Sequence, residues 1–155
     1  MKEVTIVRVV VQRVAHAAVE VEGRIVGQIR HGLLVLVGFR AGDDYAALEW
    51  MAGKIAGLRL FEGADEKMNL SVQEVGGEVL LVPQFTLYGD CRKGRRPGFS
   101  EALAPAQATR LFDQFAGLFV PPGLPPQTGV FGAHMEVSLL NDGPVTLIID
   151  SPSPA

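Results

Sequence analysis

Apolar and polar residues alternate with a two-residue period through the first part of the chain. Val4 to Val14 and Ala17 to Glu22 are rich in β-branched residues and predict two strands. Glu22-Gly23 predicts a hairpin that leads into a third strand over Ile25 to Ile29. Gly32 to Phe39 (GLLVLVGF) is apolar on both faces, as expected of a central strand. This part of the chain therefore predicts a β-meander.

Two later stretches have apolar residues at helical spacing. The first predicts a helix from about Asp44 to Leu58, with Asp43 and Asp44 placed to cap its start. The second predicts a helix after Pro105, with an apolar stripe formed by Leu111, Phe112, Phe115, Leu118 and Phe119. Aromatic residues in such a stripe fit a helix that packs on a core.

Three more strands are predicted around the second helix. Gly76 to Leu87 (GGEVLLVPQFTL) predicts a buried strand opened by Gly76-Gly77, and Ala133 to Leu140 alternates between two faces. The Pro-rich stretch Val120 to Gly129 is a connector, and a last strand covers Val145 to Ile149. The pattern predicts one α+β domain over residues 1–150, with a mainly antiparallel, curled or barrel-like sheet and two main helices. Residues 151–155 are expected to form a flexible tail.

Composition narrows the class of protein and its compartment. The chain has 155 residues, 48% hydrophobic and 20% charged, which is typical of a globular domain. Its single cysteine, Cys91, cannot form an internal disulfide and favours a reducing, cytoplasmic compartment. No segment reaches the roughly 18 consecutive apolar residues of a membrane span, and the N-terminal stretch lacks the apolar core of a signal peptide. We therefore expect no membrane association.

One short segment is strongly basic although the chain carries a net charge of −3. Within Cys91 to Gly98 (CRKGRRPG), the cations are Arg92, Lys93, Arg95 and Arg96. Two interpretations are open. The segment is either a solvated loop rim or a loop that contacts the phosphates of a nucleic acid.

Familiar catalytic motifs do not occur in the sequence. There is no phosphate-binding loop, nucleophile elbow, zinc-protease motif or dinucleotide fingerprint. His16, His31 and His134 have no spacing that suggests a metal site or a catalytic triad. We therefore expect neither a metal nor a cofactor.

Two segments are not explained by periodicity, and they carry a family resemblance. Pro83-Gln84-Phe85-Thr86-Leu87 and Asn141-Asp142-Gly143-Pro144-Val145-Thr146 are similar to the motifs Ser-Gln-Phe-Thr-Leu and Asn-x-Gly-Pro-Val-Thr of the D-aminoacyl-tRNA deacylases. Further similarity lies in QRV, GLLVLVG, KMNLSV, RPGFS and TGVFGAHMEVSLLNDGPVT. The resemblance extends from about Val9 to Ile149.

One position departs from the family motif. Pro83 stands where the family has serine, which removes a hydroxyl and a backbone N–H. A related branch that edits L-alanine on a threonine tRNA also begins this motif with Pro-Gln, but it carries alanine where this chain has Phe85. The other four residues match the D-specific enzymes.

The resemblance implies a substrate and a means of selecting it. The substrate would be a D-amino acid, and also glycine mischarged on an alanine tRNA, esterified to the 3′-terminal adenosine of tRNA. Gly143-Pro144 would be a cis dipeptide inserted from one subunit of a homodimer into the pocket of its partner. Its carbonyl oxygens would accept hydrogen bonds from the substrate ammonium and leave no room for the side chain of an L-amino acid.

The same resemblance implies roles for individual residues. Backbone N–H groups around Phe85 and Thr86, next to Gln84, would form an oxyanion hole for catalysis. Thr86 would have a positioning role, and catalysis by its hydroxyl is the less favoured alternative. Arg13 would brace the Gly143-Pro144 segment. The walls around the terminal adenine would be Phe131 and Met135, although both also fit as core residues. The residues that contact tRNA would be Arg92, Lys93, Arg95 and Arg96.

Two other functions stay open on the sequence alone. The chain could be a non-catalytic nucleic-acid-binding module with the same fold, which would use its basic loop on phosphates. Alternatively, Pro83 could indicate editing of a small L-aminoacyl-tRNA. Release of amino acid from D- and L-aminoacyl-tRNAs would separate these functions.

Overall fold

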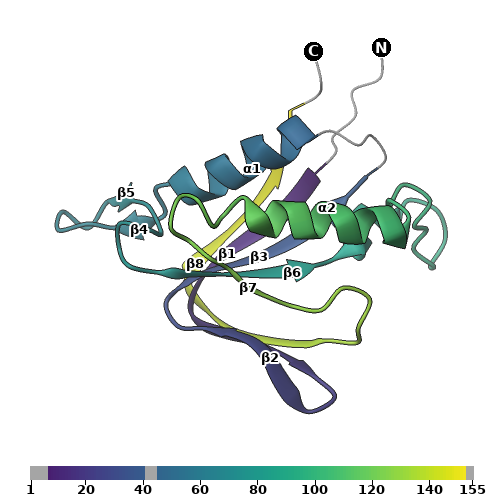
Figure 1. The fold of residues 1–155 in the computed structure, drawn as a ribbon, viewed down its shortest axis with the longest axis horizontal. Coiled ribbons are helices and arrows are strands. Elements are labelled where there is room, and N and C mark those ends of the chain that lie inside the picture. Colours follow the sequence, from purple (N-terminus) through teal and green to yellow (C-terminus); the bar gives the residue numbers. More distant parts are fainter. Residues whose placement is uncertain (1–6, 41–44, 153–155) are drawn as a thin grey trace.

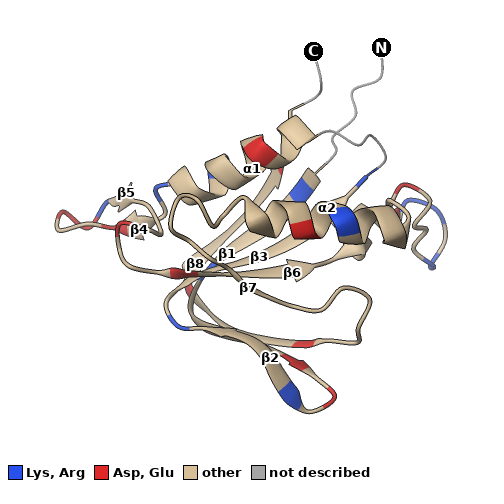
Figure 2. Ribbon diagram, in the orientation of Figure 1, with Lys and Arg blue, Asp and Glu red and all other residues tan. Residues whose placement is uncertain are grey.

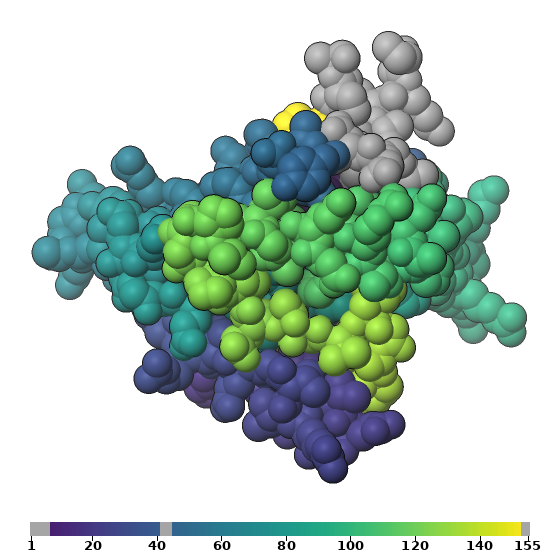
Figure 3. All heavy atoms as spheres, viewed as in Figure 1, coloured from purple at the N-terminus to yellow at the C-terminus, as the bar shows by residue number. Residues whose placement is uncertain are grey.

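A strongly curved sheet carries both long helices on one of its faces (Figure 1). The computed structural model describes residues 7–40 and 45–152. Asp43 and Asp44, the predicted helix caps, lie outside these residues, as do Val4 at the start of the first predicted strand and most of the predicted tail. In the space-filling view, α2 (Pro105–Gly117) and the segment after it cover the front of the sheet (Figure 3).

The elements follow one another in an α+β order, as the sequence predicts. In the first part of the chain they are β1 (Val7–Val21), β2 (Arg24–Ile29), β3 (Gly32–Phe39), α1 (Tyr45–Gly57), β4 (Phe61–Glu62) and β5 (Met68–Leu70). In the second part they are β6 (Glu78–Pro83), the 3-10 helix η1 (Phe85–Tyr88), α2, β7 (Gln127–Thr128) and β8 (Glu136–Asp150). None of the described helices has the length and apolar character needed to cross a membrane.

The long strand β1 organises the sheet. One of its edges pairs with β8, while its other edge pairs first with β3 and then with β2, all antiparallel. β6 adds in parallel to β3, and β7 adds in parallel to β6. The curl brings β2 close to β7, because a Cβ atom on Gly27 would lie 2.7 Å from the carbonyl oxygen of Thr128. Only glycine fits at this close approach, so the sequence permits the barrel-like shape.

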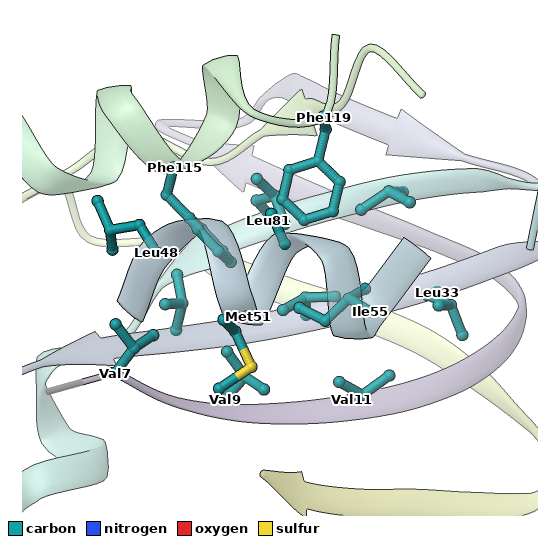
Figure 4. Packing of buried hydrophobic residues seen from close by; sticks show 14 of the residues in the cluster. Val7, Val9, Val11, Leu33, Leu48, Met51, Ile55, Leu81, Phe115 and Phe119 are labelled. Carbon is teal, nitrogen blue, oxygen red and sulfur yellow. The ribbon is translucent and has the colours of Figure 1, made fainter. Parts of the chain in front are cut away.

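Side chains on both faces of the sheet are buried, in two separate clusters. Under the helices, Val9, Leu33 and Leu81 meet Phe115 and the other helix residues shown in Figure 4. Inside the curl lies a smaller cluster formed by Val14, Ala17, Val19, Ile29, Leu34, Leu80 and Val82. β3 supplies Leu33 to one cluster and Leu34 to the other, which confirms that it is a central strand with two apolar faces.

Several predicted boundaries differ from the structure. The two strands predicted over Val4 to Val14 and Ala17 to Glu22 are one strand, β1, which continues through an irregularity between Val14 and His16. That irregularity shifts the alternation, so that Val9 and Val11 face the helices whereas Ala17 and Val19 face the second cluster. A bulge can turn a strand without ending it, and the sequence pattern alone shows only the change of phase.

Three other predicted boundaries were wrong. The strand predicted to run to Leu87 ends at Pro83, and η1 follows. α2 ends at Gly117, so Phe119 of the predicted stripe lies after the helix although it is fully buried. The strands predicted over Ala133 to Leu140 and Val145 to Ile149 are joined in the single strand β8.

Candidate functional site

The motif Asn141 to Thr146 forms a bulge in β8. Gln12 of β1 lies opposite Thr146, and Val14 lies opposite Asn141. One residue of β1, Arg13, therefore faces the four residues 142–145, and the surplus backbone must leave the plane of the sheet. The Gly143–Pro144 peptide bond in this bulge is cis, and both residues are exposed.

The Arg13 side chain holds the base of the bulge. It is only 8% exposed. Its Nε donates to the carbonyl oxygen of Asp142 at 2.9 Å, and a terminal nitrogen donates to the carbonyl oxygen of Leu60 at 2.6 Å. The carboxylate of Asp142 lies 3.6 Å from Arg13 Nε and 3.9 Å from His31 Nε2. A guanidinium with backbone acceptors on two segments ties the bulge to the loop before β4.

Asn141 closes the bulge from its other side. Its side-chain oxygen accepts from the Val145 N–H at 3.2 Å, and its amide nitrogen donates to the Val145 carbonyl oxygen at 3.0 Å. The same amide nitrogen lies 3.4 Å from Thr146 Oγ1, which also accepts from the side-chain amide of Gln12 at 3.3 Å. A short side chain with both an acceptor and a donor is needed for this exchange, which explains the asparagine.

Glycine is the only residue type that fits at position 143 of the bulge without strain. Its φ is +150°, and a Cβ atom there would lie 2.7 Å from the Val145 nitrogen and 3.2 Å from an Arg13 nitrogen. Any other residue would have to displace the backbone or the bracing guanidinium. The bulge thus presents a small, exposed and well-braced backbone loop.

The other motif turns a strand into a short helix. β6 ends at Pro83, the Gln84 N–H donates to the Val37 carbonyl oxygen at 2.7 Å, and η1 begins at Phe85. The Gln84 side-chain amide donates to Thr86 Oγ1, and Thr86 is exposed. In a 3-10 helix the first N–H groups have no acceptor within the helix, so those of Phe85 and Thr86 can donate hydrogen bonds to an oxygen of a ligand.

A pocket of about 530 Å³ lies beside this turn. Gln84 and Phe85 line it together with Phe131, His134 and Met135. The structure therefore brings together four of the residues predicted for catalysis and adenine binding. Thr86, Arg13, Gly143 and Pro144 do not line it. No group of three or more His, Cys, Asp or Glu side chains that could hold a metal ion occurs in the described part of the chain.

The two motifs lie at opposite ends of the sheet within one chain. Arg13 pairs with Leu33, whereas Pro83 pairs with Val37. These positions on β3 are four residues apart, which corresponds to about 13 Å along the strand. Gly143 lies against Arg13, and the pocket lies at the Pro83 end. Neither Gly143 nor Pro144 lines the pocket of its own chain.

The predicted basic loop is fully exposed beyond η1, and its blue segments lie at the right-hand edge of Figure 2. The carboxylate of Asp90 binds the Arg92 guanidinium at 2.8 and 2.9 Å and accepts from the Arg92 N–H at 3.0 Å. These hydrogen bonds, those of the side chain above all, lower the pKa of Asp90 to about 2. Among the described residues, Lys93, Arg95 and Arg96 form no ion pair, so they are the free cations of the loop.

Three features of the site were missed from the sequence. Asn141 belongs to a recognisable motif but was not expected to act, and its pairing with Val145 depends on a bulge that no local pattern reveals. Phe99 contacts Phe85 edge to face, with ring centroids 5.2 Å apart, and its position in RPGFS was the available signal. His134 lines the pocket, and its place next to Met135 in TGVFGAHMEVSLLNDGPVT was the available signal.

Comparisons with known sequences match nearly the whole chain. A family model described as D-Tyr-tRNA(Tyr) deacylase matches residues 10–150. The D-aminoacyl-tRNA deacylase of Desulfitobacterium hafniense (strain DSM 10664 / DCB-2) is 60% identical over 144 residues, which are 93% of this chain and 97% of that protein. The protein of the same name from Thermotoga petrophila is 54% identical over 144 residues, with the same coverage of 93% and 97%.

Comparisons with solved structures match the same fold. The structure of a protein named c-Myc DNA Unwinding Element Binding Protein has a TM-score of 0.88 and 38% identity, covering 94% of this chain and 99% of the other. A probable eukaryotic D-amino acid tRNA deacylase has a TM-score of 0.79 and 21% identity, covering 93% of this chain and 98% of the other. At that lower identity, the second likeness supports the fold alone.

Proposed function

The chain belongs to the D-aminoacyl-tRNA deacylase family, whose members hydrolyse the ester bond of aminoacyl-tRNA, and we propose that it selects D-aminoacyl-tRNA and rejects the L-isomer through the Gly143-Pro144 bulge. Glycine mischarged on an alanine tRNA is a second proposed substrate, because it has no side chain to reject. The observation that supports this proposal is that Gly143 and Pro144 are exposed and do not line the pocket of their own chain. We place the reaction in the cytoplasm, where a reducing environment suits the exposed thiol of Cys91.

The pocket beside η1 is suited to the terminal adenosine with its amino acid. Phe85, Phe99 and Phe131 line it, and aromatic rings can stack on a base. Met135 adds a flexible apolar wall that adapts to the shape of a bound group. An adenine held there places the ester carbonyl toward the start of η1.

The N–H groups at the start of η1 are then the proposed oxyanion hole. An aminoacyl ester is already activated, and preorganised N–H donors stabilise the charge that develops on its carbonyl oxygen. Within the described residues, the Thr86 hydroxyl has a hydrogen bond from the Gln84 amide and none to a histidine or carboxylate. With no base to activate it, Thr86 positions the turn and does not attack the ester.

Replacement of Thr86 tests this mechanism. The variant Thr86→Ala should keep most of the deacylase activity and lose about tenfold in kcat, whereas loss of an essential nucleophile costs on the order of 10⁴-fold or more. The control is Thr109→Ala, which removes a hydroxyl that donates to the Pro105 carbonyl oxygen of α2 at 2.8 Å. A loss for Thr86→Ala near the larger figure would restore a side-chain nucleophile.

A homodimer would complete the site by bringing the bulge of one chain to the pocket of the other. In the described part of the chain, β8 pairs only with β1, so its other edge is open. Ile148 and Leu140 of β8 are 72% and 54% exposed. Exposed apolar residues beside an open strand edge are typical of a surface that associates.

Mixed dimers test whether the bulge acts on the partner's pocket. Gly143→Ala should inactivate the bulge, and Ala133→Trp should fill the pocket, so that each variant alone is inactive. A dimer with one chain of each kind retains an intact site only if an intact bulge enters the intact pocket of the other chain. Recovered activity in purified mixed dimers supports the proposal, and none indicates that each chain completes its own site.

The substrate preference is tested by amino-acid release at equal enzyme concentration. D-tyrosyl-tRNA and glycyl-tRNA should be hydrolysed, whereas L-tyrosyl-tRNA and L-alanyl-tRNA should be spared. Preferential release of L-alanine would instead support editing of a small L-aminoacyl-tRNA, as Pro83 suggests. Binding of tRNA without any release would contradict the deacylase function and favour a nucleic-acid-binding role, the kind of role that the name of one solved relative describes.

A further inference from the structure

A second, polar recess lies at the end of η1 away from the pocket and holds three arginines. It has a volume of about 440 Å³, and its lining includes Arg8, Arg40 and Arg92. We propose that these arginines bind the phosphodiester that immediately precedes the terminal adenosine of the substrate. This subsite deepens the proposed function and rests on it, since it presumes that the adenosine occupies the pocket beside η1.

The two hollows lie at the two ends of the same short helix. Gln84 and Phe85, at the start of η1, line the pocket, whereas Tyr88 and Gly89, at its end, line the recess. Four residues of a 3-10 helix extend about 8 Å, a length that one nucleotide can span. A strand of RNA that leaves the pocket along η1 would therefore place its next phosphate at the recess.

The arginines are held in place but retain donors for a ligand. Arg8 pairs with Asp150 at 2.8 Å, donates to the Leu87 carbonyl oxygen at 3.2 Å and stacks 4.9 Å from the centre of the Tyr88 ring. Arg40 pairs with Glu101 at 2.9 Å through one terminal nitrogen. A guanidinium has five N–H donors, so each of them can still bind a phosphate oxygen.

The charge around the recess favours an anion although the chain is acidic overall. The cations at the recess and on the adjoining loop are Arg8, Arg40, Arg92, Lys93, Arg95 and Arg96. The carboxylates paired with them are Asp90, Glu101 and Asp150. Among the described residues, these positive charges exceed the negative ones by three, whereas the whole chain carries −3. Such local excess attracts a phosphodiester without general affinity for nucleic acid.

The test compares three esters of D-tyrosine that differ in the phosphates they carry. D-tyrosyl-adenosine has none, the D-tyrosyl ester of the dinucleotide CpA has the one phosphodiester in question, and D-tyrosyl-tRNA has all of them. The variants are Arg8→Gln and Arg40→Gln. The control is Arg24→Gln, which removes an exposed cation from the start of β2, outside the recess.

The subsite predicts a loss confined to substrates that contain the phosphodiester. For each variant, KM for the CpA and tRNA esters should rise about tenfold, as expected for loss of a charge-assisted hydrogen bond. Their kcat should stay unchanged, as should both constants for D-tyrosyl-adenosine. The logarithm of kcat/KM for D-tyrosyl-tRNA falls linearly with the logarithm of the salt concentration. The steepness of this fall should decrease by about 0.7 for each phosphate contact that a variant loses. Arg24→Gln should match the wild type with all three esters.

Three results would overturn the subsite. Unchanged KM values for the CpA ester would show that the recess does not meet this phosphate. An equal rise for D-tyrosyl-adenosine would show that Arg8 and Arg40 act on the shape of the pocket, through contacts such as that of Arg8 with Leu87. If the wild type released D-tyrosine from none of the esters, the proposed function would fail, and the subsite with it.

Discussion

Two arginine–aspartate pairs in this molecule differ in how far the arginine is buried and in which acceptors it binds. Arg13 beside Asp142 is 8% exposed and donates to backbone carbonyl oxygens on two segments. Arg92 beside Asp90 is 83% exposed, and every donor that it uses goes to a carboxylate two residues away. A buried guanidinium with distant backbone acceptors fixes the shape of the chain, whereas an exposed, local pair can exchange its partner for a ligand.

The largest effect should follow loss of the buried arginine. Arg13→Ala leaves the carbonyl oxygens of Leu60 and Asp142 without their donor and should lower the free energy of unfolding by about 3 kcal/mol, as for charged hydrogen bonds. Displacement of the bulge should cost about 100-fold in kcat/KM for D-tyrosyl-tRNA, the effect of a misplacement near 1 Å. Urea unfolding and initial rates measure the two quantities.

A lysine at the same position separates charge from geometry. Arg13→Lys keeps the cation but not the fork that reaches both carbonyl oxygens, so its activity should stay close to that of Arg13→Ala. Full activity of the lysine variant would show that only a positive charge is required. Full activity of the alanine variant would remove the bracing role altogether.

The second largest effect should follow loss of Asn141, the other side chain that holds the bulge. Asn141→Ala removes the acceptor of the Val145 N–H and the donor to its carbonyl oxygen, which should cost about 2 kcal/mol of stability. Asn141→Asp keeps the acceptor and should lose less. The control Asn69→Ala removes an amide whose contact with Asp65, at 3.5 Å, is exposed and long. Equal urea midpoints for Asn141→Ala and Asn69→Ala would contradict the brace.

The same bulge shows what the sequence could and could not predict. Alternation correctly placed the residues on both sides of Asn141 to Thr146 in strands, and the resemblance implied that Arg13 braces Gly143-Pro144. The pattern also suggested two strands, because a glycine and a proline interrupt it. Whether the segment is a turn or a bulge depends on the partner strand, and register is not encoded locally.

The pocket and the recess differ in how far the sequence reveals them. Gln84, Phe85, Phe131 and Met135 were predicted because they lie in or near motifs, and the structure brings them together. Arg8 and Arg40 were not predicted, since each is an isolated arginine in a strand region and meets Arg92 only through folding. A cluster of residues that are contiguous in the chain can be predicted from the sequence. A cluster that is assembled from several strands can be identified only once the fold is known.

The third effect should fall on tRNA affinity and leave the bulge unaffected. Combined replacement of the three free cations of the loop, Lys93, Arg95 and Arg96, by alanine should raise KM for D-tyrosyl-tRNA. It should also reduce the salt slope by about 2, at roughly 0.7 for each single-strand phosphate contact. The turnover of bound substrate should be unchanged. An unaltered salt slope would mean that the loop is merely solvated.

The smallest effect on stability should follow loss of the exposed pair, Arg92 and Asp90. The pKa of Asp90 is lowered to about 2, first by the side chain of Arg92 and then by its N–H. Because the folded pKa is depressed, the pair stabilises the fold above the unfolded pKa and loses that contribution as pH falls toward 2. Arg92→Gln should return the Asp90 pKa, followed by NMR of its carboxyl carbon, toward the ordinary value of about 3.9. The urea midpoint at pH 7 should nevertheless barely change, because an exposed pair is screened by water and salt.

An Asp90 pKa that stays near 2 in this variant would assign the shift to the N–H of residue 92. A large fall in the urea midpoint would show that the exposed pair shapes the chain as the buried one does.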